Sequence, residues 1–249
     1  MLKIILFLAC GVLIVAVTLL RAKTAMAAEA DTITTSEGPL TIGLIGHGSV
    51  YFQFKGMVIQ VDPYSAVGDY SALPKADMVL ISHEHYDHLD PKALALTVKL
   101  GAPVVTNAAA GAEVAGAKIM KNGDKLTLKG IHIEAVPAYN MVHKRPDGEF
   151  FHPKGVGNGY ILTFGDKRVY VSGDTEDIPE MAALAGIDVA FISVNLPYTM
   201  DPEMAVHAAK LVKAKILYPY HEGDTDMAKL GALLKKAVPD TDVRIRSMK

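Results

Sequence analysis

The sequence predicts an α/β fold in which two packed β-sheets carry helices on their outer faces. Strand-type segments, short and either apolar or alternating, are followed by helix-type segments, and the same order occurs twice along the chain. Periodicity alone would also allow a generic α/β layer fold. The chain has 249 residues, 50% of them hydrophobic, which suits one large domain or two tightly fused halves.

The first half begins with an expected antiparallel meander, whose strands are the short runs 40–45, 50–54 and 57–61. A helix is expected over 91–100, because Pro91 stands at its start and Gly101 follows its end. The remaining elements of this half are strands at 76–82, 103–106 and 131–136, a small-residue helix or turn over 108–115, and a tight turn over 121–124.

The second half repeats this plan. Its first two strands, 160–164 and 168–172, flank a hairpin signal at 165–167. Three helices and two further strands follow, with the helices expected over 177–184, 202–214 and 225–237 and the strands over 189–193 and 216–218.

Residues 1–27 have the order of a secretory signal peptide. Lys3 gives a basic start, residues 4–20 form an apolar run, and Ala25 and Ala27 provide a small-x-small cleavage site. The run spans 17 residues, which is close to the lower limit for a membrane span, so an uncleaved anchor is the alternative. We therefore expect an exported protein, periplasmic or secreted, that contacts a membrane only through residues 4–20 if they are retained.

The charge balance argues against nucleic acid as a partner. The 25 basic and 27 acidic residues give a net charge of −2, with no basic stripe. Cys10 is the only cysteine, so residues 28–249 contain none and form no disulfide. Packing, and a metal if one binds, must then stabilise this part of the chain. The sequence does not indicate an oligomeric state.

The stretch His83-Glu84-His85-Tyr86-Asp87-His88 places four potential metal ligands within six residues. It follows a strand-type segment, so a rigid base would hold the imidazoles while their ring nitrogens converge. Neutral imidazole and carboxylate suit zinc, and also iron or manganese when carboxylates contribute. The alternative is a polar surface turn whose histidines have no role. The density of ligands favours a metal site.

This motif resembles the signature of the metallo-β-lactamase superfamily, and the resemblance extends from about residue 40 to residue 221. Further similar elements occur in the family's order, at Asp62-Pro63, Gly173-Asp174-Thr175 and Tyr220-His221. Gly46-His47 resembles the early Gly-His of the branch that includes ascorbate-6-phosphate lactonase and N-acyl phosphatidylethanolamine phospholipase D. The resemblance implies a four-layer α/β/β/α sandwich and a metal-dependent hydrolase domain over 28–249.

The same resemblance implies a dinuclear site. One metal would be held by His83 and His85, and the other by Asp87, His88 and His221, with Asp174 bridging the two. Asp174 has an alternative role as the cap of a helix that starts near residue 178, and His221 as a turn residue. His47 is expected at the edge of the active site, near the substrate or behind the ligands, or else in a solvent-facing turn.

Asn140 departs from the family pattern, because many members place a histidine ligand for the first metal near this position. Asn is a poor zinc ligand, so either the site lacks a ligand or a nearby histidine replaces it. We favour His152 as the replacement, with His143 as the alternative. His132, within a strand, and His207, on a helix, are expected to be structural or solvated.

Two ions, Zn²⁺ first and Mn²⁺ or Fe²⁺ as alternatives, would generate a metal-bound hydroxide at neutral pH and polarise the bond under attack. Asp87 would orient that hydroxide and receive its proton. The expected reaction is hydrolysis of an ester, lactone or phosphodiester-type bond in a small-molecule or lipid substrate. Two alternatives are a degenerate binding protein, because of Asn140, and a di-iron redox protein. The redox protein would typically carry an acidic residue in place of His85.

Overall fold

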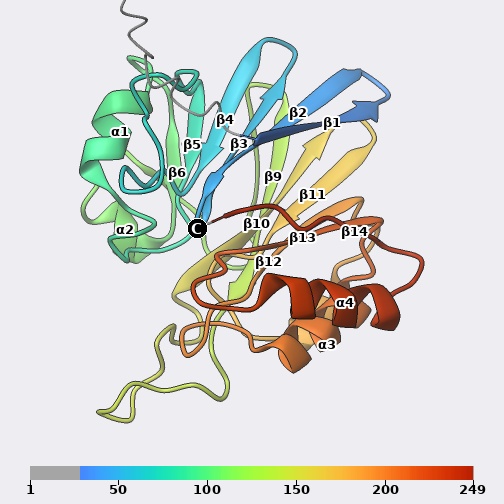
Figure 1. Cartoon of the computed structure of the whole chain (residues 1–249). Coiled ribbons are helices and arrows are strands. Elements are labelled where there is room, and N and C mark those ends of the chain that lie inside the picture. The colour runs from blue at the N-terminus through green and yellow to red at the C-terminus, as the bar shows by residue number, and fades with distance from the viewer. Residues whose placement is uncertain (1–28, 249) are drawn as a thin grey trace, which may run out of the picture.

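The strand segments pair into two seven-stranded β-sheets that pack face to face, with helices on both outer faces (Figure 1). The computed structural model describes residues 29–248. The predicted four-layer α/β/β/α sandwich is confirmed. The expected signal peptide or anchor at 1–27 lies outside the described residues. Within 29–248, none of the helices combines the length and apolar character that crossing a membrane would need.

The first sheet follows chain order from β1 to β7. Strands β1 to β4 are antiparallel neighbours, and β4 to β7 are parallel. Helices α1 (Pro91–Thr97) and α2 (Ala108–Gly111) belong to the parallel half and cover its outer face. The strands are β1 (Glu29–Thr35), β2 (Gly38–Gly46), β3 (Ser49–Phe54), β4 (Met57–Val61), β5 (Met78–Leu80), β6 (Val104–Thr106) and β7 (Lys118–Ile119).

The second sheet runs from β8 to β14, again in chain order. Strands β8 to β11 are antiparallel and β11 to β14 are parallel. A 3₁₀ helix, η1 (Pro179–Ala183), and the helices α3 (Pro202–Val212) and α4 (Met227–Ala237) cover its outer face. The strands are β8 (Lys125–Leu128), β9 (Ile131–Ala138), β10 (Gly157–Phe164), β11 (Lys167–Val171), β12 (Val189–Ser193), β13 (Ile216–Tyr220) and β14 (Asp242–Val243).

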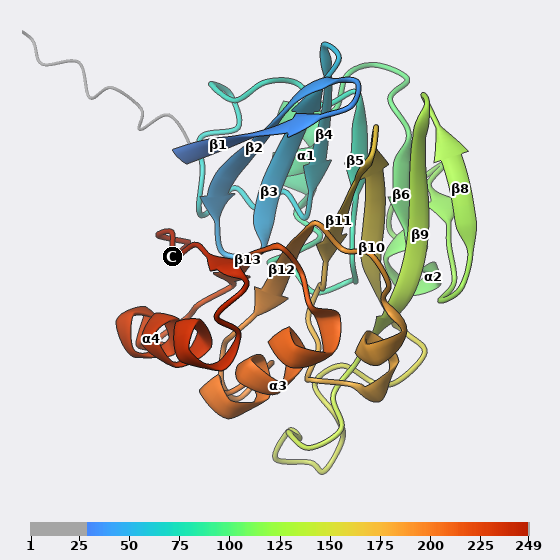
Figure 2. The same ribbon diagram turned by 90° about the vertical axis from the view of Figure 1, so that its right-hand side faces the viewer.

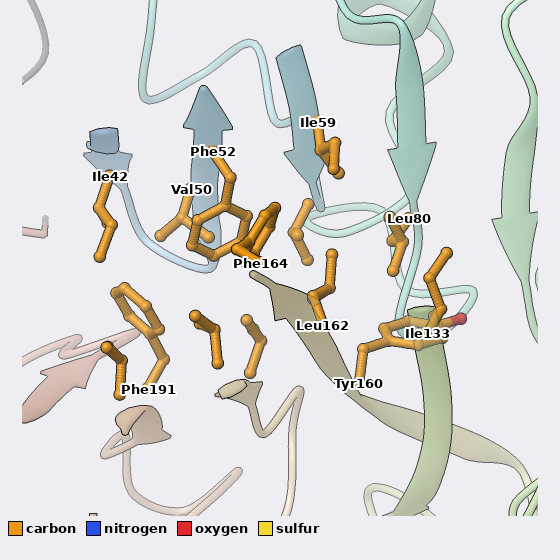
Figure 3. Close-up of a cluster of buried hydrophobic side chains, with 14 of the residues drawn as sticks. Ile42, Val50, Phe52, Ile59, Leu80, Ile133, Tyr160, Leu162, Phe164 and Phe191 are labelled. Atoms are coloured by element: carbon orange, nitrogen blue, oxygen red, sulfur yellow. The ribbon is translucent and has the colours of Figure 1, made fainter. Parts of the chain in front are cut away.

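The main core lies between the two sheets. Phe52 from the first sheet meets Phe164 and Phe191 from the second, with ring centroids 5.4 and 6.2 Å apart (Figure 3). Strand β9 alternates, with Ile131 and Ile133 buried and the intervening residues partly exposed, so one face points to this core. Strand β12 is buried throughout, as expected of a parallel strand with helices on one side and a sheet on the other.

All five predicted helices are shorter in the structure, and for two of them the local reason is clear. The helix expected over 91–100 ends at Thr97, because Val98 is extended and forms a bridge with Ala76. The helix expected over 177–184 is the short η1, and Ile178, the N-cap residue before it, provides no side-chain cap. Strands β1, β7, β8 and β14 were not predicted. They lie at or near sheet edges, and the apolar alternation that identifies a strand is weak in them.

One edge of the sandwich collects the ends of several strands. The antiparallel pairs set β2 and β4 in the same direction, and β5 is parallel to β4. In the second sheet, β9, β11, β12 and β13 share a direction in the same way. The loops after these strands meet at this edge, where the amide of His221 donates to the carbonyl oxygen of His47 at 3.0 Å. The two halves of the chain therefore build one site together.

Candidate metal centre

All seven residues expected to bind metal lie at this edge, in loops that follow or precede strands. The motif loop follows β5, Asp174 follows β11 and His221 follows β13. His152 precedes β10 and reaches the same edge from a long connection after β9. Residues far apart in sequence thus come within reach of one another, because strand direction brings their loops to one edge.

A first cluster consists of His83, His85 and His152, whose donor atoms lie within 4.8 Å of one another. The Nε2 atom of His83 is 3.0 Å from Nδ1 of His85. The His152 ring lies 4.9 Å from the rings of both His83 and His85. Of the two replacements considered for Asn140, the structure therefore brings His152 to the site.

A second cluster consists of Asp87, His88 and His221. The Nε2 atoms of His88 and His221 lie 3.2 Å apart, and Asp87 Oδ2 is 3.9 and 3.8 Å from them. His47 adjoins this cluster: its Nε2 lies 2.8 Å from Asp87 Oδ2, and its ring packs against His221 at 3.7 Å. His47 is therefore at the edge of the site and not in a free solvent-facing turn.

Asp174 lies between the two clusters and presents one carboxylate oxygen to each. Oδ2 is 3.3 Å from His152 Nε2 and 4.0 Å from His83 Nε2. Oδ1 is 3.4 Å from the Nε2 atoms of both His88 and His221. The alternative role of Asp174 as a helix cap is wrong, because the next helical turn begins only at Pro179 and its cap residue is Ile178.

Two atoms of this arrangement are buried without a hydrogen-bond partner among the described residues, namely His152 Nε2 and Asp174 Oδ1. Buried polar atoms are normally satisfied, so such orphans call for a partner that the protein itself does not supply. Imidazole and carboxylate donors gathered in this way fit zinc, and manganese or iron nearly as well. The residues present therefore fit a centre of divalent cations.

Asp62 orients His88 from behind the second cluster. Its buried carboxylate accepts from His88 Nδ1 at 2.8 Å, and from the amide and hydroxyl of Ser82 at 2.7 and 2.6 Å. A carboxylate on Nδ1 leaves Nε2 of the same ring free for a metal, a usual arrangement in metal sites. Sequence reasoning placed Asp62 in a family element but assigned it no role.

Asn140 orients His152 in the corresponding way. Its Oδ1 accepts from the backbone amide and from Nδ1 of His152, both at 2.8 Å. Its Nδ2 donates to Glu176 at 3.0 Å, which fixes which side-chain atom is the oxygen. His143 instead pairs with the buried carboxylate of Glu176 at 2.8 Å and stays outside both clusters. The residue at the expected ligand position thus supports the histidine that replaces it.

His132 and His207 lie away from the clusters. His132 Nδ1 is 3.3 Å from the hydroxyl of Thr127 on the neighbouring strand. The exposed His207 pairs with Asp177 at 2.6 Å. Both are structural or solvated, as predicted.

Burial and neighbouring charges set the protonation of the clusters. Burial lowers the pKa of His83 and lowers that of His221 to about 4, so both rings are neutral at pH 7, the form that binds metal. Burial opposes ionisation of Asp87, but its hydrogen bond with His47 prevails and lowers the Asp87 pKa to about 2. Burial also disfavours charge on His88, yet Asp174 and Asp62 together raise the His88 pKa above its usual value. A cation at Nε2 of His88, on the side of Asp174, would take the place of the second ring proton.

The backbone of the site is held in unusual conformations. His47, Asp62 and His221 all have positive φ, at 51°, 46° and 54°. A non-glycine residue in this region costs roughly 1–2 kcal/mol, and such strain clusters at functional sites. Gly48 leaves room for the second cluster, because a Cβ there would lie 2.8 Å from Cε1 of His88.

A pocket of about 470 Å³ opens onto both clusters. Apart from residues already described, it is lined by Tyr86, Arg145, Phe151, Asn195 and Tyr198. The sequence offered no signal for Arg145, which lies with Phe151 on the long connection between β9 and β10. Another hollow, of about 540 Å³, lies at the ends of α3 and α4, and its lining includes no histidine.

Known proteins of one family resemble this chain in sequence. The sequence pattern of the beta-lactamase superfamily domain matches residues 41–221. A UPF0173 metal-dependent hydrolase of Thermus thermophilus is 32% identical over 186 residues, covering 71% of this chain and 81% of the relative.

Solved structures show the same fold. A proposed metal-dependent hydrolase from Parabacteroides distasonis is 46% identical, with a TM-score of 0.83, covering 89% of this chain and all of that chain. A metallo hydrolase from Ignicoccus hospitalis, 24% identical with a TM-score of 0.69, covers 84% of this chain and 95% of that chain. The second likeness shows the fold alone.

Proposed function

This chain belongs to the metallo-β-lactamase superfamily and is a metal-dependent hydrolase, and we propose that it cleaves an ester, lactone or phosphodiester-type bond at a centre of two cations. Zinc is the cation we propose first, with manganese or iron as alternatives, because imidazoles outnumber carboxylates among the donors. The proposed substrate is a small molecule or lipid that enters the pocket over the two clusters.

We assign the first cation to His83, His85 and His152, and the second to Asp87, His88 and His221, with Asp174 contacting both. The observation that carries this assignment is the carboxylate of Asp174, which directs one oxygen to each cluster. If only one cation bound, the buried imidazoles of the other cluster would have no cation to ligate. Burial of such groups is costly unless they are paired.

Cations held at these residues would lower the pKa of a water molecule towards 7 and polarise the oxygen of the bond under attack. Asp87 is ionised at neutral pH and lines the pocket, so it would accept the proton of the attacking water. His47 is hydrogen-bonded to Asp87 and also lines the pocket, and we propose that it holds this carboxylate and contacts the leaving group. Asp62 and Asn140 would keep His88 and His152 oriented throughout.

Metal content by elemental mass spectrometry, with hydrolysis of 4-nitrophenyl esters and bis(4-nitrophenyl) phosphate, tests this proposal. We expect about two zinc or manganese ions per chain and turnover of at least one probe. Asp174→Asn, His85→Ala and His152→Ala should each lose metal and activity. His207→Ala removes an exposed histidine outside the clusters and is the matched control.

Other outcomes would change the assignment. One metal that survives His152→Ala would favour a mononuclear enzyme. Iron with an oxidation-dependent visible spectrum would favour the redox alternative, and metal without turnover would favour a binding protein. No metal under any loading condition would refute the proposal.

A further inference from the structure

The connection between β9 and β10 projects from the sandwich as an arm, residues 141–151, drawn in yellow-green in both views (Figures 1 and 2). Its tip is a tight turn, in which the amide of Arg145 donates to the carbonyl of Glu149 at 2.7 Å. Lys144 and Phe150 form an isolated antiparallel β-bridge beside this turn. The arm connects Asn140 to His152, and it carries Arg145 to the wall of the pocket.

A buried carboxylate fixes the base of this arm. Glu176 accepts the backbone amides of Met141, Val142 and His143 at 2.6–2.7 Å, and it also pairs with the ring of His143. Three backbone donors on one buried carboxylate hold the first turn of the arm in a single conformation. The arm is therefore a built wall of the pocket, and Arg145 has a defined position on it.

The guanidinium of Arg145 has no anionic partner in its contacts within residues 29–248. Its Nη2 atom donates to the carbonyl of Phe151 at 3.2 Å and lies 3.1 Å from His85 Nε2, and its Cζ lies 5.8 Å from the Phe151 ring. A guanidinium has five donors in a planar fork that matches carboxylate and phosphate oxygens. Most of these donors remain available to a ligand in the pocket.

The contact with His85 changes when that histidine binds metal. Nδ1 of His85 faces His83 in the first cluster, so Nε2 is the atom that faces Arg145. A ring nitrogen that ligates a cation carries no proton, so the proton of the neutral ring is then on Nε2. Two donors, Arg145 and His85 Nε2–H, would then meet at the present separation of 3.1 Å, so the guanidinium would have to move aside. An acceptor beside both groups, such as an anionic oxygen of a ligand, would satisfy the two donors together.

We propose that Arg145 and His85 Nε2–H form a binding site for an anionic group of the substrate, beside the reaction centre. This inference rests on the proposed function and adds a substrate class: a hydrolysable compound with a carboxylate or phosphoryl group close to the scissile bond. The other charged side chains of the pocket are Asp87 and Asp174, whose charges bound cations would neutralise. The rings of Phe151 and Tyr198, whose centroids lie 5.0 Å apart, form an apolar wall for the rest of the substrate.

Calorimetric binding of phenylphosphonate and of benzoate to the zinc-loaded protein tests the site without turnover. Arg145→Gln should weaken binding of at least one of them about 10- to 100-fold, the effect of a lost charge-assisted hydrogen bond. Lys144→Gln removes the same charge from the adjacent residue, whose side chain lies over Phe150 and does not line the pocket. It should leave binding within about twofold, as expected for an exposed charge outside the pocket.

A loss for phenylphosphonate alone would assign the site to phosphoryl oxygens, and a loss for benzoate alone to carboxylates. Equal affinity of the wild type and Arg145→Gln for both ligands would overturn the inference. No binding of either ligand to the wild type would also overturn it. Elemental analysis of each variant shows whether the metal has stayed in place.

Kinetics with a matched pair of esters adds a second readout. 4-Nitrophenyl hemisuccinate differs from 4-nitrophenyl butyrate mainly by its carboxylate, so the ratio of their kcat/KM values reports charge recognition. If the carboxylate binds here, Arg145→Gln should lower this ratio about 10- to 100-fold, and Arg145→Lys should restore part of it. If zinc-loaded wild type hydrolyses no probe, the proposed function fails, and the calorimetry still decides the inference.

Discussion

At the scale of single residues, Asn140 shows how a site can change a ligand without losing it. Its amide oxygen holds both the backbone and Nδ1 of His152, which leaves Nε2 of that ring directed at Asp174. A residue behind a ligand sets the orientation and basicity of that ligand. Asn140 is therefore a positioning residue for the first cluster, and its effect should appear in metal affinity.

We expect Asn140→Ala to weaken binding of the first cation about 10- to 100-fold, the usual effect of losing such a partner. Affinity is measured by competition with a chromophoric zinc chelator. Asn158→Ala is the matched control, because Asn158 is equally buried but its side-chain amide donates to Met120 and Tyr160, neither of which is a proposed ligand. That variant should lose stability and keep its metal affinity. Equal zinc affinity of Asn140→Ala and wild type would contradict the role assigned to Asn140.

At the scale of elements, β1 is fastened by charge as well as by its pairing with β2. Asp31 accepts from the hydroxyl of Tyr218 on β13 at 2.5 Å and from Arg246 at 2.9 Å. Arg244 adds a third contact at 3.2 Å. Partial burial would raise the pKa of Asp31, but these hydrogen bonds and charges prevail and lower it below its ordinary value of 3.8. One carboxylate thus links the first described strand to the C-terminal segment.

A carboxylate whose pKa is lowered by folding stabilises the protein above its unfolded pKa, and this contribution is lost as the pH falls through the folded pKa. Asp31→Asn should therefore lower the free energy of unfolding by about 1.5–3 kcal/mol at pH 7. The difference from wild type should begin to shrink near pH 3.8, where Asp31 of the unfolded chain becomes protonated, and should disappear as the pH falls through the lower pKa of the folded state. Urea unfolding of metal-free Asp31→Asn and metal-free wild type, at pH 7 and at pH 3, measures this difference.

Asp240→Asn is the control for that experiment, since Asp240 is exposed, makes no ion pair within residues 29–248 and should contribute little. A constant difference between Asp31→Asn and wild type from pH 7 to pH 3 would show that charge is not what fastens β1.

At the scale of the whole molecule, the proposed centre joins the two sheets. His83 and His88 come from the first half of the chain, and His152, Asp174 and His221 come from the second. Cations bound between them would stabilise only the folded arrangement, because the unfolded chain does not hold these donors together. Metal should therefore contribute to stability as well as to catalysis.

Removing metal with a chelator should lower the melting temperature by about 8–16 °C for each site that was held at a thousand times its Kd. Adding zinc should restore it. Asp174→Asn, which weakens both proposed sites, should show a smaller shift. Differential scanning calorimetry, with metal content checked in parallel, makes the comparison. An unchanged melting temperature in protein shown to be stripped of metal would separate the centre from the stability of the fold.

Export stays a prediction, because residues 1–27 lie outside the described part of the chain. The mass of the purified protein would distinguish cleavage after Ala27 from an intact N-terminus.

Much of the fold could be predicted because its central strands carry strong apolar patterns. The strands predicted over 57–61 and 189–193 have those bounds in the structure. Strand β1 could not be predicted, since its polar segment is a strand only through its pairing with β2. The helix expected over 91–100 is shorter because Val98 pairs with Ala76, a contact between residues that the local pattern does not relate.

The sequence by itself determined the class of chemistry, because four ligand-type side chains within six residues restrict what the loop after β5 can do. Only the tertiary structure decided between His143 and His152. Glu176 pairs with His143 and holds it outside the clusters, whereas Asn140 orients the ring of His152 towards the first cluster. Both contacts join residues that are distant in the sequence. The position of Arg145 in the pocket was decided in the same way. A local sequence pattern specifies which donors are available, whereas the loops that meet at one edge of two packed sheets decide which of them converge.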